Sequence, residues 1–173
     1  MTLPRVAALR LVTFGVGDGW YAMDVTHVER VLRREGVQSI PGMPPWMEGV
    51  VEHHGRIVPV ISLRLRFGID AVERPATSRL LVLSLGEDLL AVSVDRVLDV
   101  RAVAPTDVTP PPRLLQGMVG AYLGGMVRHG DAMVLVLDVD RLFGADERVA
   151  LDRCRDVAPV HSLAIAAVRG ADG

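Results

Sequence analysis

The strongest constraint on the fold is a pair of similar segments in the two halves of the chain. "HHGRIVPVISLRLRFG" in the first half and "RHGDAMVLVLDVDRLFG" in the second can be laid over each other. The overlay places His54 over His129 and Phe67 over Phe143, with one extra residue in the second copy. Each copy carries Val, Leu and Ile around a glycine turn, which is typical of a β-hairpin. A chain of 173 residues has room for two such units.

Two further hairpins are predicted upstream of these segments. Residues 9–16 and 20–25 flank a Gly-Asp-Gly turn, and residues 79–85 and 89–95 flank a Gly-Glu-Asp turn. Glycine supplies the positive φ that tight hairpin turns need. Each half therefore contains a hairpin, a Val-rich segment, a proline-bearing connection and a second hairpin.

Local signals refine this pattern. Residues 26–29, Thr-His-Val-Glu, match a capping box and predict a short helical turn. Pro59 lies inside the strand predicted over residues 56–62 and removes a backbone donor, so we expect that strand at an edge or at a bulge. Residues 104–112, APTDVTPPP, cannot form a central strand. From Asp140 onward the pattern becomes helical.

These elements predict an all-β fold with short helices. We expect two packed five-stranded β-barrel subdomains, because closed barrels leave no free strand edges. The units cover about residues 9–68 and 79–144 and together form a single domain over residues 1–155. A single β-sandwich is the alternative architecture. Residues 156–173 are predicted to form a flexible C-terminal tail, because this terminal segment is rich in small residues.

Charge and composition restrict the class of partner. The formal net charge is −2, which argues against nucleic acid or an anionic membrane as the main partner. No run reaches the roughly 18–20 apolar residues that span a bilayer, and the first residues do not resemble a signal peptide. The single cysteine, Cys154, fits a reducing compartment. We therefore expect a cytoplasmic protein without direct membrane insertion.

The adjacent histidines His53 and His54 are the first candidates for chemistry. Neighbours on a strand point to opposite faces, so they should not chelate one metal ion together. Zinc sites need three or four ligands, and no Cys cluster or H-E-x-x-H motif accompanies them. Cys154 has no assigned base nearby in the sequence. We expect no metal, no cofactor and no catalytic residues; a small β-barrel hydrolase that uses His54 or Cys154 is the less favoured alternative.

Apolar residues near predicted surfaces favour an interaction module over an enzyme. The proline-stiffened stretch MPPWMEG carries Trp46. Two further groups follow the first hairpin of each unit: Val28, Val31 and Leu32, and Val97, Leu98 and Val100.

Several of these segments together resemble the CheW family, the adaptors that couple chemoreceptors to the CheA histidine kinase in bacteria. The resemblance covers about residues 9–152. It rests on YAMDVTHVERV, on IPGMPPWMEGVVEHHGRIVPVISLRLRFG, on LLAVSVDRVLDV and on GDAMVLVLDVDRLF, in this order. It implies two five-stranded β-barrels side by side and a non-enzymatic scaffold in two-component signalling.

The resemblance also implies two sets of binding residues. The cytoplasmic tip of a methyl-accepting chemoreceptor would contact a groove between the barrels, at Val28, Gly49, His54, Val97 and Val100. The regulatory domain of a CheA-type kinase would pair with strand edges at Gly55, Arg56, Ile57 and Val58. A further kinase contact would lie near residues 113–118. In such a role the protein would be recruited to receptor arrays at the inner face of the membrane.

This sequence departs from the family pattern at the first glycine turn. Where the family usually has Asn-Leu-Arg-Gly, residues 52–55 are Glu-His-His-Gly. A glutamate that often accompanies the arginine is replaced by Arg30. We therefore expect an altered charge pair between Arg30 and Glu52 and a receptor surface adapted to a divergent partner. A CheW-like module in a non-chemotaxis sensory or motility pathway remains the alternative function.

Overall fold

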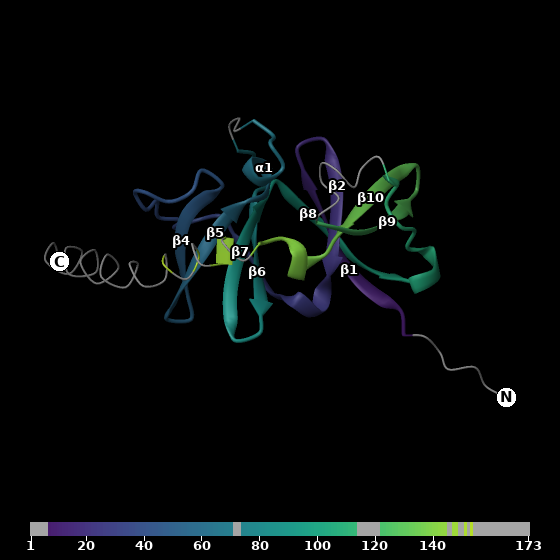
Figure 1. Cartoon of the computed structure of the whole chain (residues 1–173), viewed down its shortest axis with the longest axis horizontal. Helices are drawn as coiled ribbons and strands as arrows, with labels where there is room; N and C mark the ends of the chain where they lie inside the picture. The colour runs from purple at the N-terminus through teal and green to yellow at the C-terminus, as the bar shows by residue number, and fades with distance from the viewer. Residues whose placement is uncertain are drawn as a thin grey trace, which may run out of the picture.

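Strands dominate the structure, a computed structural model that describes residues 7–70, 74–113, 122–144, 147, 148, 151 and 153. Two five-stranded sheets lie side by side (Figure 1). Sheet A has the order β8 (Arg96–Val103), β1 (Leu9–Val16), β2 (Gly19–Asp24), β10 (Ala132–Leu137) and β9 (Leu123–His129). Sheet B has the order β3 (Val28–Arg33), β6 (Arg79–Leu85), β7 (Asp88–Val94), β5 (Arg56–Ser62) and β4 (Met47–His53).

The four predicted hairpins are confirmed as β1–β2, β4–β5, β6–β7 and β9–β10. Their turns carry Gly17, Gly55, Gly86 and Gly130, all at positive φ. The short helical turn also forms, but earlier than the capping box predicts, as the 3₁₀ helix η1 (Val25–His27). Its cap is the residue before it, whose carboxylate accepts a hydrogen bond from the Thr26 amide.

The two sheets do not correspond to the predicted units 9–68 and 79–144. Sheet A combines the first hairpin of the first unit with β8, β9 and β10 of the second, and sheet B has the reciprocal composition. The chain passes from sheet A to sheet B through η1 and returns after β7. Both sheets have the same strand order once equivalent strands are matched, so the repeat is real but its hairpins are exchanged. Both sheets are open, which corrects the prediction of closed barrels.

The register of the second hairpins corrects the sequence overlay. His53 pairs with Arg56 across the first turn, and His129 pairs with Ala132 across the second. Both turns therefore contain two residues, and no residue is inserted in the second copy. His129 is the counterpart of His53 and not of His54.

The prediction that Pro59 places its strand at an edge is wrong, because β5 lies between β7 and β4. Parallel pairing with β7 begins at Val60, directly after the proline. On the other side Pro59 is opposite Val50, whose amide and carbonyl both bond to Gln38, each at 2.8 Å. The bulge of this hairpin lies in β4. Pro59 thus occupies a position where neither neighbouring strand needs its missing donor.

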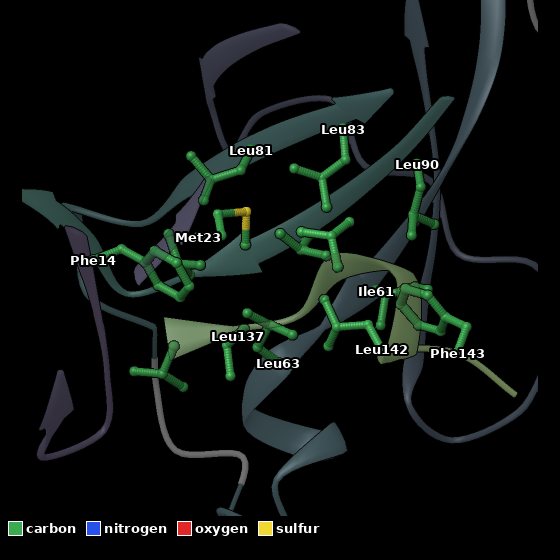
Figure 2. Packing of buried hydrophobic residues seen from close by; sticks show 14 of the residues in the cluster. Phe14, Met23, Ile61, Leu63, Leu81, Leu83, Leu90, Leu137, Leu142 and Phe143 are labelled. Carbon is green, nitrogen blue, oxygen red and sulfur yellow. The ribbon is translucent and has the colours of Figure 1, made fainter. Parts of the chain in front are cut away.

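A shared hydrophobic core joins the two sheets (Figure 2). Phe14 and Met23 come from sheet A, and Leu81 comes from sheet B. The helix α1 (Leu63–Arg66) adds Leu63, and Leu142 follows the 3₁₀ helix η4 (Val139–Arg141). All five side chains are fully buried. Since each such side chain stabilises the fold by about 1.5–3 kcal/mol, the core fixes how the two sheets sit against each other.

Each sheet also curves around a smaller cluster of its own. In sheet B the cluster is Val51, Val58, Val60, Leu80, Val82, Leu89 and Ala91. In sheet A it is only Leu11, Ala22, Val127 and Val134. The connection over residues 104–112 contains the 3₁₀ helix η2 (Pro105–Asp107) and a single bridge from Thr109 to Met126, so it is not a central strand, as predicted.

Tyr21 gives the fold a predictable response to alkaline pH. Its ring stacks on Phe67 at 4.9 Å between centroids, and burial raises the pKa of its hydroxyl above 10.0. The unfolded chain therefore ionises first, so this contribution to stability is complete below about pH 10 and is lost as the pH rises through the folded pKa. The sequence has no lysine, which leaves few other groups titrating there.

We expect the urea midpoint of the native protein to fall more steeply above about pH 10 than that of Tyr21→Phe. The variant keeps the ring contacts and removes the ionisable hydroxyl. Equal slopes for the two proteins would contradict this assignment.

Candidate interaction surface

Exposed apolar side chains concentrate on two edge strands. Within the described residues, four large apolar side chains are exposed, and three of them belong to β3 or β8. Val31 lies on β3, and Leu98 and Val100 lie on β8; the last two are each 47% exposed. Edge strands also carry unpaired backbone groups, so both strands offer apolar area and hydrogen-bonding capacity to a partner.

The internal repeat makes these two strands equivalent. Val28 is opposite Leu83 on β6, and Val97 is opposite Phe14 on β1, with a bulge following in each edge strand. Val28 and Val97 are partly buried and pack against the shared core. Each edge strand therefore begins at the junction of the sheets and continues outward to an exposed valine, Val31 or Val100.

Three of the predicted receptor-binding residues thus belong to this surface, namely Val28, Val97 and Val100. The prediction did not include Val31 and Leu98, which the structure exposes beside them. Leu98 is the extra residue of the bulge in β8, and a bulge re-aims its side chain. The apolar residues after the first hairpin of each unit indicated this surface, but the sequence alone did not show which of them face outward. We call Val28, Val31, Val97, Leu98 and Val100 the edge-strand surface.

The histidine pair lies at the turn between β4 and β5. His53 is 6% exposed, whereas His54 is exposed and adopts φ 50 in the turn. The expectation that the two rings point apart is wrong, because His54 has left the strand. Its ring meets that of His53 edge-on, with 4.1 Å between centroids. His53 also lies close to Glu29, and 3.6 Å separate Nε2 of His53 from Oε1 of Glu29.

The predicted kinase-binding residues have different environments. Gly55 and Arg56 are exposed at the turn, and Arg56 donates a hydrogen bond to the carbonyl of Glu87. Ile57 is partly buried against the shared core, and Val58 is completely buried. Because β5 is an interior strand, the edge strand at this end of sheet B is β4, and Gln38 bonds to Val50 in the middle of that edge. The predicted contact near residues 113–118 falls almost entirely outside the described residues.

The expected Arg30–Glu52 pair does not form, which corrects that prediction. Arg30 is opposite Val82, so it lies on the face of sheet B that carries the cluster around Val51. Glu52 follows Val51 in β4 and points to the other face. Both charged side chains are exposed, and Glu29 is the acidic residue that faces His53.

Gly49 is placed by backbone packing. It is buried at φ 147, and a Cβ at this position would overlap the carbonyl oxygen of Gln38. That carbonyl accepts a hydrogen bond from Val50, as part of the bridge that covers the middle of β4. Gly49 therefore shapes the edge of sheet B and offers no side chain to a partner.

The site contains few groups suited to catalysis. Within the described ranges, no group of three or more His, Cys, Asp and Glu side chains gathers where it could hold a metal ion. His27, His53 and His129 lie on different elements. Cys154 and the tail over residues 156–173 lie outside the described residues. The same part of the chain contains no helix long and apolar enough to cross a bilayer.

The sequence profile described as the CheW-like domain matches residues 10–147. This chain belongs to the CheW family. The chemotaxis protein CheW of Treponema pallidum (strain Nichols) is 31% identical over 142 residues, which cover 80% of this chain and 84% of that protein. The chemotaxis protein CheW of Klebsiella aerogenes is 27% identical over 139 residues, with the same two coverages.

A solved structure supports the same assignment at the level of the fold. The crystal structure of the scaffolding protein TtCheW from Thermoanaerobacter tengcongensis matches with a TM-score of 0.74 and 26% identity. The match covers 81% of this chain and 95% of that chain. The resemblance to the CheW family and the CheW-like all-β fold are therefore confirmed, with open sheets in place of closed barrels.

Proposed function

We propose that this CheW family member is a non-enzymatic adaptor that couples chemoreceptors to a CheA-type histidine kinase. The carrying observation is the edge-strand surface, where exposed apolar side chains coincide with two free strand edges. Relatives named chemotaxis protein CheW and a relative named a scaffolding protein support this role. The adaptor would act in the cytoplasm and join receptor arrays at the inner face of the membrane.

The receptor would bind the edge-strand surface. The cytoplasmic tip of a chemoreceptor would lay apolar side chains against Val31, Leu98 and Val100, while Val28 and Val97 support them from the core. His54 would border this contact, and Gly49 would act through the shape of β4. Burial of apolar area supplies the affinity, and the strand edges fix the orientation.

The kinase's regulatory domain would bind the β4–β5 turn. Gly55 and Arg56 are accessible there, and the end of β4 beyond the Gln38 bridge lies next to them. Ile57 and Val58 would hold the turn in place from the protein interior, since both side chains pack inward. This assigns the predicted kinase-binding residues to one hairpin with an exposed tip and a buried base.

The receptor contact can be tested with Val31→Asp and Val100→Asp. We expect each variant to weaken binding to the isolated receptor tip by about tenfold or more, because a charge replaces an apolar contact. Binding to the kinase's regulatory domain should stay unchanged. Surface plasmon resonance with both partners from the same organism measures both affinities.

Met133→Asp is the matched control. Met133 is the fourth exposed apolar residue of the described chain, at 41%, but it lies on β10 and not on β3 or β8. Receptor affinity that survives Val31→Asp and Val100→Asp, or that falls equally in Met133→Asp, would refute the assigned surface. Wild-type protein that binds neither partner would instead favour a non-chemotaxis pathway.

A further inference from the structure

Sheet A contains a cavity of about 670 Å³. The cavity is bordered by β8 and β9, the two edge strands of that sheet. We call the gap between these strands the seam of sheet A. Leu11, Ala22, Val127 and Val134 form the apolar floor. This size falls within the range of about 300–1,000 Å³ that small-molecule sites occupy.

In sheet B, ion pairs cross the equivalent gap, between β3 and β4. Arg34, which directly follows β3, pairs with Glu48 of β4 at 2.6 Å. Glu29 of β3 faces His53 of β4 at 3.6 Å. The side chain of Glu48 is 3% exposed, so the first of these pairs closes its end of the gap tightly.

The seam of sheet A lacks the residues that make these pairs. The matched registers place Val103 where sheet B has Arg34, and Gly124 where it has Glu48. Leu98 takes the place of Glu29. The repeat thus retains the strands and loses both links across the gap.

Two substitutions make the space behind the seam more polar. Leu32 is opposite Leu80 in sheet B, and the equivalent position opposite Leu11 in sheet A is Arg101. Thr13 likewise stands where sheet B has Val82. Leu32 packs against the interior cluster of sheet B, whereas Arg101 is 46% exposed at the cavity mouth. A polar residue of nearly the same shape and a partly exposed cation stand where sheet B has two apolar side chains.

The mouth of the cavity is lined by charged residues. Arg101 and Arg128 line it together with a single acidic residue, Asp107. Arg101 also donates to Asp99 at 3.1 Å, but both side chains are exposed, so a competing anion can replace that contact. His129 lines the same region, and its buried Nδ1 atom has no hydrogen-bond partner.

From this arrangement we propose that the cavity binds a small amphipathic carboxylate. The apolar body of the ligand fills the space over Ala22 and Val134, and the carboxylate accepts hydrogen bonds from the guanidinium of Arg101. Arginine recognises carboxylates through charge-assisted, bidentate hydrogen bonds, which makes it suited to this position. Thr13 adds a hydroxyl on the cavity wall.

Decanoate is a suitable probe, with decanol as its neutral counterpart. Isothermal titration calorimetry should show saturable binding of decanoate, and NMR should show a shift of the Ala22 methyl signal. Decanol should bind at least tenfold more weakly. Absence of saturation with decanoate at millimolar concentration, or equal binding of decanol, would overturn the proposal.

The repeat supplies the variants, because sheet B shows which residues fill this space. Thr13→Val with Arg101→Leu introduces the sheet B residue types and should reduce decanoate affinity at least tenfold. Arg101→Leu alone removes the cation and keeps the Thr13 hydroxyl, so it tests recognition of the carboxylate separately from the change at Thr13. Arg30→Leu is the control, because Arg30 is an exposed arginine on β3, the equivalent edge strand of sheet B. It should leave decanoate affinity unchanged. Undiminished affinity in Arg101→Leu would also refute the site.

Discussion

Asp95→Ala should lower the free energy of unfolding by about 3–5 kcal/mol. The Asp95 side chain is 8% exposed and accepts hydrogen bonds from the amide of Gly17 at 2.7 Å and from Nε of Arg64 at 2.9 Å. The bonds to Asp95 raise the pKa of Arg64 above its ordinary value. Removing the carboxylate leaves Nε of Arg64 and the turn amide without their acceptor, and donors left unpaired in a largely buried site are costly.

This loss would act on the junction of the two sheets. Asp95 follows β7 at the point where the chain returns to sheet A, and its amide donates to the carbonyl of Gly15 at 2.9 Å. Its carboxylate joins the β1–β2 turn to α1, the helix that contributes Leu63 to the shared core. Chemical denaturation with an unchanged m-value measures the effect.

Asp99→Ala is the matched control. Asp99 also pairs with an arginine, at 3.1 Å, but both partners are more than 40% exposed. Exposed pairs contribute about 0–1 kcal/mol, so this variant should remain close to the native protein. Asp95→Asn should fall between the two, because the amide oxygen still accepts one hydrogen bond. An Asp95→Ala protein within 1 kcal/mol of the native one would contradict the assigned role.

Local patterns predicted most elements of the fold, because glycine turns and strand periodicity act over a few residues. All four hairpins formed at the expected glycines. Strand partners were not predictable in this way. The exchange of hairpins between the sheets depends on where the shared core buries Phe14 and Leu81 together, and no local signal records that choice. The edge position predicted for the strand of Pro59 was wrong for the same reason, because the sequence does not show which strands lie on either side of it.

The candidate site divides along similar lines. Val100 was predicted from a family position and is exposed, whereas Val58, from the same source, is buried. Exposure depends on which strands end a sheet, and that follows from topology. The predicted Arg30–Glu52 pair does not form, because the two side chains lie on different faces of sheet B. Those faces follow from the bulge and the strand register, which the sequence does not show. Family motifs located the segments of the surface, and the structure was needed to identify its accessible residues.

Gly49→Ala should have the second-largest effect, a loss of about 2–4 kcal/mol in stability. The new Cβ would overlap the Gln38 carbonyl oxygen, and φ 147 is strained for any residue other than glycine. Relief requires Gln38 to move and its two hydrogen bonds with Val50 to break, each contributing about 0.5–1.5 kcal/mol. Thermal and chemical unfolding measure the loss.

Gly125→Ala provides a comparison within the same molecule. Gly125 is the counterpart of Gly49 in β9, opposite Val136 as Gly49 is opposite Val60. Its φ is not in the left-handed region, and an added Cβ would lie 2.5 Å from Cγ1 of Val108 and 3.1 Å from the nearest backbone oxygen. A valine side chain can shift, so this variant should lose only about 1–2 kcal/mol. Equal losses in the two variants would show that backbone overlap is not the cause.

The Gly49→Ala variant also separates a structural role of Gly49 from direct contact with the receptor. If Gly49 acts through folding, Gly49→Ala should bind the receptor tip at native affinity once measurements are restricted to temperatures where the variant is folded. Binding capacity should then decline in step with unfolding as the temperature rises. A tenfold loss of affinity in fully folded protein would instead place Gly49 in direct contact with the receptor. Because the glycine is buried beneath Gln38, we expect the first result.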